Sequence, residues 1–310
     1  GWIGWTTITF AVMYLATATQ MSTLAPSAAD RFNLQKSLSL APAMTMLLGR
    51  FGHPETVAST VAWRIGLFMA AALAVLAALT VVRHTRAEED AGRLELLAAG
   101  RLGRGSNLAA AVLAALALVL VVSAASSAAL VGRGASASQL AANFVALMLP
   151  ALVAIAVAAL AAQAVASARA AKAVAISIVL IAYALRGLSD VRGLETLTQI
   201  NPFGWYVAVD PFGDINIWPA VLSAAIFGVL ACVAFVLDSR RDLGAGLFAV
   251  GAGRPHARFL TGPGTLVTRL GWRTLVGWQV VMVLMGVFVG SLMPDLADLV
   301  GTTPQFKQII

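Results

Sequence analysis

Charged residues are scarce in this chain. Only 11% of its 310 residues are Asp, Glu, Lys or Arg, while 60% are hydrophobic and the mean hydropathy is +0.87. Soluble globular domains carry about 25% charged residues. A chain with so few charges cannot cover a fully water-exposed surface, so part of its surface must face lipid.

Cysteine and histidine are also rare, and their shortage excludes several kinds of site. The single cysteine, Cys232, cannot form a disulfide within the chain or build a cysteine–histidine metal cluster. The three histidines, His53, His84 and His256, are far apart, and no H-E-x-x-H motif occurs. We therefore expect no metal site, no catalytic residues and no cofactor held by this chain.

The chain has no phosphate-binding loop of the G-x-x-x-x-G-K-[ST] type. Its three lysines are Lys36, Lys172 and Lys307, and none of them follows a glycine. Such a loop holds ATP phosphates with its backbone amides and its lysine. If ATP drives this protein, ATP and Mg²⁺ must be bound by a separate partner subunit.

Long apolar runs are abundant, and they predict an all-α integral membrane protein. A helix that crosses a bilayer needs about 20 predominantly apolar residues. The runs predict a bundle of about seven transmembrane helices. They cover Trp2–Gln20, Trp63–Val82, Leu108–Leu130, Leu140–Val165, Ala173–Leu185, Ile217–Leu237 and Leu275–Met293.

The basic residues predict the orientation of the bundle. If the N-terminus is cytoplasmic, the segments 83–107, 166–172 and 238–274 face the cytoplasm, and they hold thirteen of the twenty-one Lys and Arg residues. This bias agrees with the positive-inside rule. The chain has a net charge of +7, and its basic residues lie between the apolar runs. There they would face anionic lipid headgroups rather than nucleic acid. We expect a multi-pass protein of the cell membrane.

The segment from Arg83 to Gly105 carries most of the charge pattern. The spacings Arg86 to Asp90 and Glu89 to Arg93 are i,i+4, so these pairs can brace a short amphipathic helix. One interpretation is a helix resting on lipid headgroups, and the other is a docking element for a soluble partner. The acidic residues favour docking, because an anionic leaflet would repel them; they are Glu88, Glu89, Asp90 and Glu95.

Polar residues inside the predicted spans are neutral. Because no ionisable residue lies deep in these runs, a proton relay is not expected. Neutral groups usually join helices, and a minority could line a substrate path. The candidates for a path are Thr9, Asn143, Gln163 and Gln279. Walls of Ala, Val, Leu and Met suit a hydrophobic small molecule.

The segments outside the predicted spans are harder to interpret. Residues 21–57 form a long loop with a short helix expected near Pro26–Arg31. In residues 187–216, the aromatic residues are interpreted either as a belt at the headgroup level or as a gate. They are Phe203, Trp205, Tyr206 and Phe212.

The stretch TVVRHTRAEEDAGRLELLAAGRLGR, followed by INPFGWYVAVDPFGDINIWP, resembles the polyketide-antibiotic (tetronasin-type) exporter permeases. These are ABC-2-like membrane subunits of ABC transporters. The resemblance implies a hydrophobic antibiotic or drug as substrate and a dimer of ATP-binding subunits as partner. It also implies that a cytoplasmic segment couples to the ATPase through Arg86, Glu88, Glu89, Gly92, Arg93 and Glu95.

The resemblance implies about twelve spans in two six-span halves. We therefore expect residues 1–237 to form the first half, 238–274 a cytoplasmic linker and 275–310 the start of a second half. The leading hypothesis is an exporter permease without enzymatic activity of its own. The alternatives are a membrane-embedded lipid-processing or biogenesis protein without an ATPase partner, and a scaffold subunit that does not transport.

Overall fold

A computed structural model describes residues 1–39, 42–50, 52–92, 103, 105–240 and 262–267, with several residues between 271 and 286. The chain divides into two compact units, Gly1–Val250 and Gly251–Ile310. In the second unit, residues 263–267 are helical. The predicted span Leu275–Met293 falls largely outside the described residues and stays a prediction.

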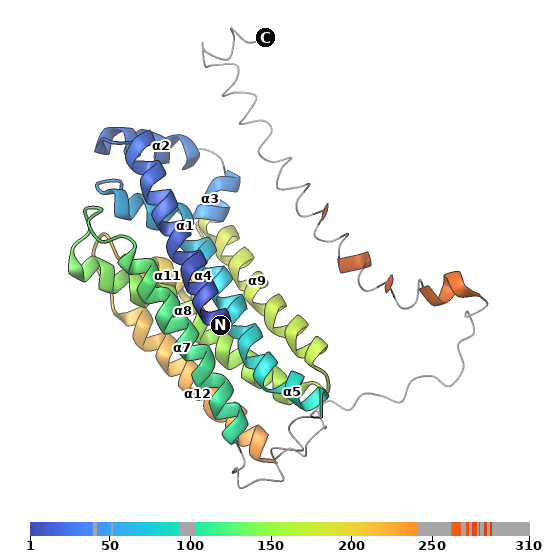
Figure 1. The fold of residues 1–310 in the computed structure, drawn as a ribbon. Helices are drawn as coiled ribbons and strands as arrows, with labels where there is room; N and C mark the ends of the chain where they lie inside the picture. The colour runs from blue at the N-terminus through green and yellow to red at the C-terminus, as the bar shows by residue number, and fades with distance from the viewer. Residues whose placement is uncertain are drawn as a thin grey trace. The chain divides into compact units, whose positions relative to one another are not determined.

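Every regular element among the described residues is a helix, as the sequence predicted. The long helices are α1 (Trp2–Leu24), α4 (Val57–His84), α7 (Ser106–Ala128), α8 (Ala137–Ala164), α9 (Ala168–Arg192) and α12 (Trp218–Arg240). The shorter helices are α2 (Ala28–Ser39), α3 (Pro42–Leu48), α5 (Arg86–Asp90), α10 (Glu195–Gln199) and α11 (Pro202–Ala208). Figure 1 shows α2 and α3 at one end of the bundle and α5 at the opposite end.

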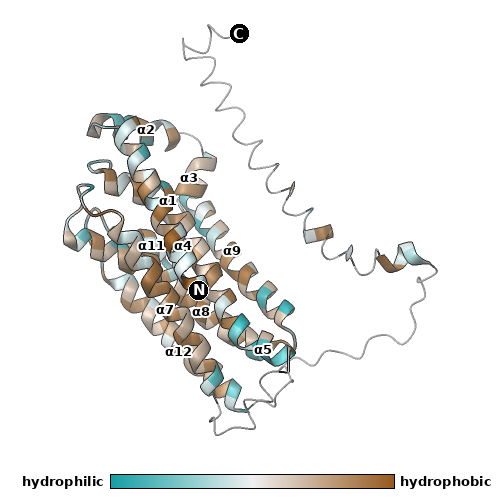
Figure 2. Ribbon diagram, viewed as in Figure 1, coloured by the Kyte–Doolittle hydropathy of each residue, from teal (hydrophilic) through white to brown (hydrophobic). Residues whose placement is uncertain are grey.

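Five of the described helices are long and apolar enough to cross a membrane: the helices α4, α7, α8, α9 and α12. A sixth span is counted if α1 and most of α2, which meet at a bend of 108°, form one broken span. Figure 2 shows hydrophobic residues along the length of these helices and polar residues gathered near their ends, notably at α5. The described residues thus support a polytopic bundle, whereas the predicted number of seven spans is not confirmed.

Helix α9 is longer than its sequence suggested. The apolar run ended at Leu185, but the helix continues to Arg192 and ends at Gly193, whose φ of +68° is the left-handed conformation common at helix ends. The start of α9 is also well defined, because the Ser167 hydroxyl accepts a hydrogen bond from the Ala170 amide. These caps fix a single 25-residue rod rather than a short span.

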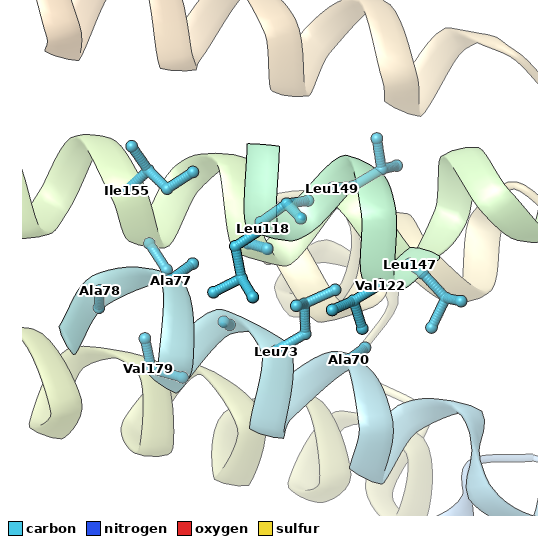
Figure 3. Close-up of a cluster of buried hydrophobic side chains, with 14 of the residues drawn as sticks. Ala70, Leu73, Ala77, Ala78, Leu118, Val122, Leu147, Leu149, Ile155 and Val179 are labelled. Atoms are coloured by element: carbon cyan, nitrogen blue, oxygen red, sulfur yellow. The ribbon is translucent and has the colours of Figure 1, made fainter. Parts of the chain in front are cut away.

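Helices α4 and α8 form the centre of the bundle. They contact each other, and both contact α7 and α9; α1 packs on α4 and α7, while α12 packs chiefly on α8. Figure 3 shows α4, α7, α8 and α9 side chains meeting in this core, including Leu73, Leu118, Ile155 and Val179. Many of the α8 core residues are alanines, and such small side chains let helices approach closely in lipid.

The aromatic residues of α11 are buried, so they do not form an exposed belt; Phe212, which follows α11, is partly buried, and the level of the segment in the membrane stays a prediction. Phe203, Trp205 and Tyr206 are at most 7% exposed. The Asn201 side chain caps α11 by accepting from the Phe203 amide, and Pro202 stands at the first helical position. The segment is therefore a short helix packed into the bundle against α8 and α9.

Candidate functional site

Two clusters of buried charge lie at opposite ends of the bundle. We call the end of α4, α5 and the start of α9 the α5 end, and we call α3 with the last turns of α9 the α3 end. Both clusters consist of an arginine and a carboxylate on one helix. Only the first was predicted from the sequence.

At the α5 end, Arg86 and Glu89 form a buried ion pair. The Arg86 Nη1 atom lies 2.7 Å from Glu89 Oε2, and the two side chains are 1% and 7% exposed. The predicted pair between Arg86 and Asp90 is wrong, because Arg86 reaches the carboxylate three residues away instead. The pair stabilises the position of α5 at the end of α4. Separating the two side chains would leave a buried charge that is neither paired nor solvated by water.

The Asp90 side chain joins α5 to a helix that starts 78 residues later. Its Oδ2 atom accepts a hydrogen bond of 2.7 Å from the Ala168 amide at the start of α9. The first amides of a helix have no partner within the helix, and a carboxylate there also meets the positive end of the helix dipole. Asp90 is therefore a link between two elements, which the sequence did not suggest.

The remaining residues of the predicted coupling set divide into two groups. The Glu88 amide donates to Thr85 O within the first turn of α5, and Gly92 follows the helix with a φ of +71° and an exposed surface. Arg93 and Glu95 lie outside the described residues, as does the predicted pair between Glu89 and Arg93. Of the segment predicted to couple to an ATPase, the structure describes a helix of five residues, Arg86–Asp90.

At the α3 end, Arg186 and Asp190 form an ion pair inside helix α9. The Arg186 Nη1 atom lies 2.7 Å from Asp190 Oδ2, and the side chains are 0% and 3% exposed. The predicted span ended at Leu185, so this pair, which lies in the last turns of α9, was not expected from the sequence. The i,i+4 spacing of the pair and Gly193 beyond it were the signals that could have revealed a longer helix.

This second pair holds α3 against α9. The Arg186 Nη2 atom donates to the carbonyls of Met46 at 2.8 Å and Leu47 at 3.2 Å, and the Tyr183 hydroxyl donates to Leu47 O at 2.6 Å. The Arg186 guanidinium also lies 4.9 Å from the centre of the Tyr183 ring. The carbonyls at the end of α3 are thereby satisfied by side chains of a helix about 140 residues away in sequence.

The residues proposed for a substrate path are not brought together. Asn143 and Gln163 are both buried on α8 but stand about 20 residues apart, which corresponds to roughly 30 Å along a helix. The Asn143 amide donates to Ser127 of α7 at 2.9 Å, so it joins two helices. Thr9 is exposed on α1, and Gln279 is exposed in the second unit. Their role in transport stays a prediction.

No group of three His, Cys, Asp or Glu side chains that could hold a metal ion occurs among the described residues. Cys232 is exposed on α12. The interactions described at both ends of the bundle are ion pairs within a helix and hydrogen bonds between helices.

Two comparisons with known proteins agree with each other. The family model described as the C-terminal domain of the multidrug efflux system permease Rv1217c matches residues 2–237 and 260–310. The chain is 32% identical over 310 residues to the multidrug efflux system permease protein Rv1217c of Mycobacterium tuberculosis (strain ATCC 25618 / H37Rv). The match covers all of this chain and 56% of that protein, so the chain spans about half the length of its relative.

Proposed function

Since the chain belongs to the family of the multidrug efflux system permease Rv1217c, we propose that it is the membrane-spanning part of an ATP-driven exporter of hydrophobic drugs. The relative is named for multidrug efflux, and the sequence motifs resemble the tetronasin-type branch of polyketide-antibiotic exporters. The observation that carries the proposal is the buried Arg86–Glu89 pair, with Asp90 linking α5 to α9.

In this proposal the α5 end faces the cytoplasm. The N-terminus is then cytoplasmic as well, and the three basic segments lie on the side that the positive-inside rule requires. ATP and Mg²⁺ are bound by separate ATP-binding subunits, a dimer in the active complex, since the permease chain carries no P-loop motif. Residues 1–237 supply one six-span half, and 275–310 begin the other.

The mechanism is mechanical. When the ATP-binding subunits close, they press on the segment around α5. Arg86 and Glu89 keep α5 rigid, because separating them would leave a buried charge without its partner. The force then reaches α4 and α9, which α5 contacts. The helices shift between arrangements open to either side, and a hydrophobic substrate passes along walls of apolar side chains.

The test is purification of the full-length permease in mild detergent, followed by a search for a bound P-loop ATPase. The complex should hydrolyse ATP faster when a hydrophobic drug is added. Glu89→Arg should abolish this stimulation, because it places two cations side by side at the buried pair. The double variant Arg86→Glu with Glu89→Arg should recover part of it.

The matched control is Asp214→Ala, since Asp214 is an exposed acidic residue remote in sequence from α5. Drug-stimulated hydrolysis should be unchanged in this variant. Transport of drug into vesicles by the permease without any nucleotide would refute the proposal. Turnover of lipid by the purified permease alone would favour the alternative of a lipid-processing protein.

A further inference from the structure

Helix α9 is held at both ends by residues that are distant in sequence. At its start, the Ala168 amide donates to Asp90 Oδ2 of α5 at 2.7 Å. Near its end, Arg186 and Tyr183 donate to the carbonyls of Met46 and Leu47 in α3. Figure 1 shows α5 and α3 at opposite ends of α9.

The α3 end is built for a firm attachment. Asp190 holds Arg186 through a 2.7 Å ion pair, and Arg186 in turn holds two carbonyls of α3. Gly187 permits the contact, because a Cβ at that position would lie 2.5 Å from Met46 O. A movement of the last turns of α9 must therefore carry α3 with it.

Between these two ends, α9 is one continuous helix, and most of its surface is not buried by the rest of the bundle. Helix α9 runs without a proline from Ala168 to Arg192. Only 22% of its most apolar window is buried, compared with 61% for α8. A continuous helix with a mostly exposed surface can shift along its neighbours as a unit, whereas α8 is enclosed on all sides by the helices that contact it.

We infer that Asp90 is a positioning residue for transport: it couples α5 to α9, and α9 carries the movement to α3. This inference rests on the proposed function, because it takes the movement of α5 as the input. Asp90 touches neither drug nor ATP in this scheme. Its effect passes through the Ala168 amide, along α9, and through Arg186 to the other end of the bundle.

The test uses the full-length permease with the ATP-binding subunit that co-purifies with it. In a background where Cys232 and every other cysteine of the full-length permease are replaced by serine, Met46→Cys places one thiol on α3, where Met46 is 37% exposed. The rate of maleimide labelling is measured with and without ATP and Mg²⁺. We expect nucleotide to change the rate several-fold, and Asp90→Ala to remove that change while leaving the nucleotide-free rate as it was.

The control variant is Ser167→Ala. Ser167 caps the same helix end through Ala170, so its loss weakens the start of α9 without cutting the link to α5. Ser167→Ala should keep the nucleotide response, and Asp90→Asn, which retains a carbonyl oxygen as acceptor, should keep most of it. If Asp90→Ala responds like the parent, or if Ser167→Ala loses the response equally, the inference is wrong.

Drug-stimulated ATP hydrolysis, measured on the same preparations, separates this inference from the proposed function. Stimulated hydrolysis in the parent, together with a labelling rate that nucleotide does not change, would overturn the role of α9 and leave the exporter assignment standing. Absence of any associated ATPase would overturn both.

Discussion

The two buried ion pairs have the same chemistry, but they differ in how distant in sequence the elements are that they connect. The Arg186–Asp190 pair at the α3 end connects α9 to Met46 and Leu47, about 140 residues earlier in the chain. The Arg86–Glu89 pair at the α5 end closes within a single helical turn. The first pair therefore holds separate elements together, whereas the second stiffens one short element.

In the proposed mechanism, the α3 end holds the bundle together and the α5 end moves. An arginine that satisfies carbonyls of another segment cannot be released without leaving several buried polar groups unpaired. At the α5 end, the Ala168 amide of α9 donates a hydrogen bond to the Asp90 carboxylate of α5. Changes at the α3 end should consequently affect stability most, and changes at the α5 end should affect coupling most.

The largest loss of stability is expected from Asp190→Ala. This variant leaves Arg186 buried without its carboxylate, and breaking one side of a buried pair costs about 3–5 kcal/mol. The free energy of unfolding, measured by denaturant titration in mild detergent, should fall by that amount. The double variant Arg186→Met with Asp190→Leu removes both charges but leaves the Met46 and Leu47 carbonyls without the Arg186 donor, so it should recover only part of the loss. Equal stability of Asp190→Ala and the parent would mean that the pair does not hold α3.

Glu89→Gln should reduce stability less than Asp190→Ala does, and it should reduce function more than changes at the α3 end. It replaces a charged hydrogen bond at Arg86 with a neutral one, and hydrogen bonds to charged groups contribute about 1.5–3 kcal/mol. Drug-stimulated ATP hydrolysis should nevertheless fall more than in Asp190→Asn, which serves as the matched amide variant. A larger loss of drug-stimulated hydrolysis in Asp190→Asn than in Glu89→Gln would contradict the different roles assigned to the two ends.

Gly187→Ala tests how closely α3 must approach α9. The new Cβ would lie 2.5 Å from Met46 O and 2.6 Å from Met46 Cγ, so α3 has to move outward. Forcing an extra methyl group into a packed contact costs about 1–3 kcal/mol. Gly228→Ala is the matched control, because nothing lies within 4 Å of its Cβ in α12, and the change should stabilise the helix slightly. Loss of stability in both variants would point to a general effect of glycine replacement.

The sequence predicted the positions of the spans well where apolar runs are uninterrupted. The run Ile217–Leu237 became α12 from Trp218 to Arg240, and the run Leu108–Leu130 became α7 from Ser106 to Ala128. Such runs can only be solvated by lipid or by each other, so their length alone defines the helix. The prediction failed at α9, because Arg186 and Asp190 resemble the polar end of a span when their mutual pairing is unknown.

The candidate site was predicted only in part, again because the sequence does not show which groups pair with each other. Local spacing paired Arg86 with Asp90, four residues later, whereas the structure pairs Arg86 with Glu89, three residues later. The partner of Asp90 is a backbone amide 78 residues away, and a backbone amide leaves no trace in the sequence. Contacts between side chains and distant backbone are therefore what the structure adds, both here and at Met46 and Leu47.

The smallest expected effect lies at a neutral contact between the last turn of α7 and the second turn of α8. The Asn143 amide donates to the Ser127 hydroxyl at 2.9 Å, and both side chains are buried between α7 and α8. A double-mutant cycle with Asn143→Ala and Ser127→Ala should give a coupling energy of about 0.6 kcal/mol, the average for hydrogen bonds between membrane helices. Ser123 is the control, because its buried hydroxyl on α7 has no hydrogen-bond partner among the residues that the structure describes, and its cycle with Asn143 should give a coupling near zero. A coupling between Asn143 and Ser127 as large as the loss in Asp190→Ala would show that neutral contacts, rather than the ion pair, carry the architecture of this bundle.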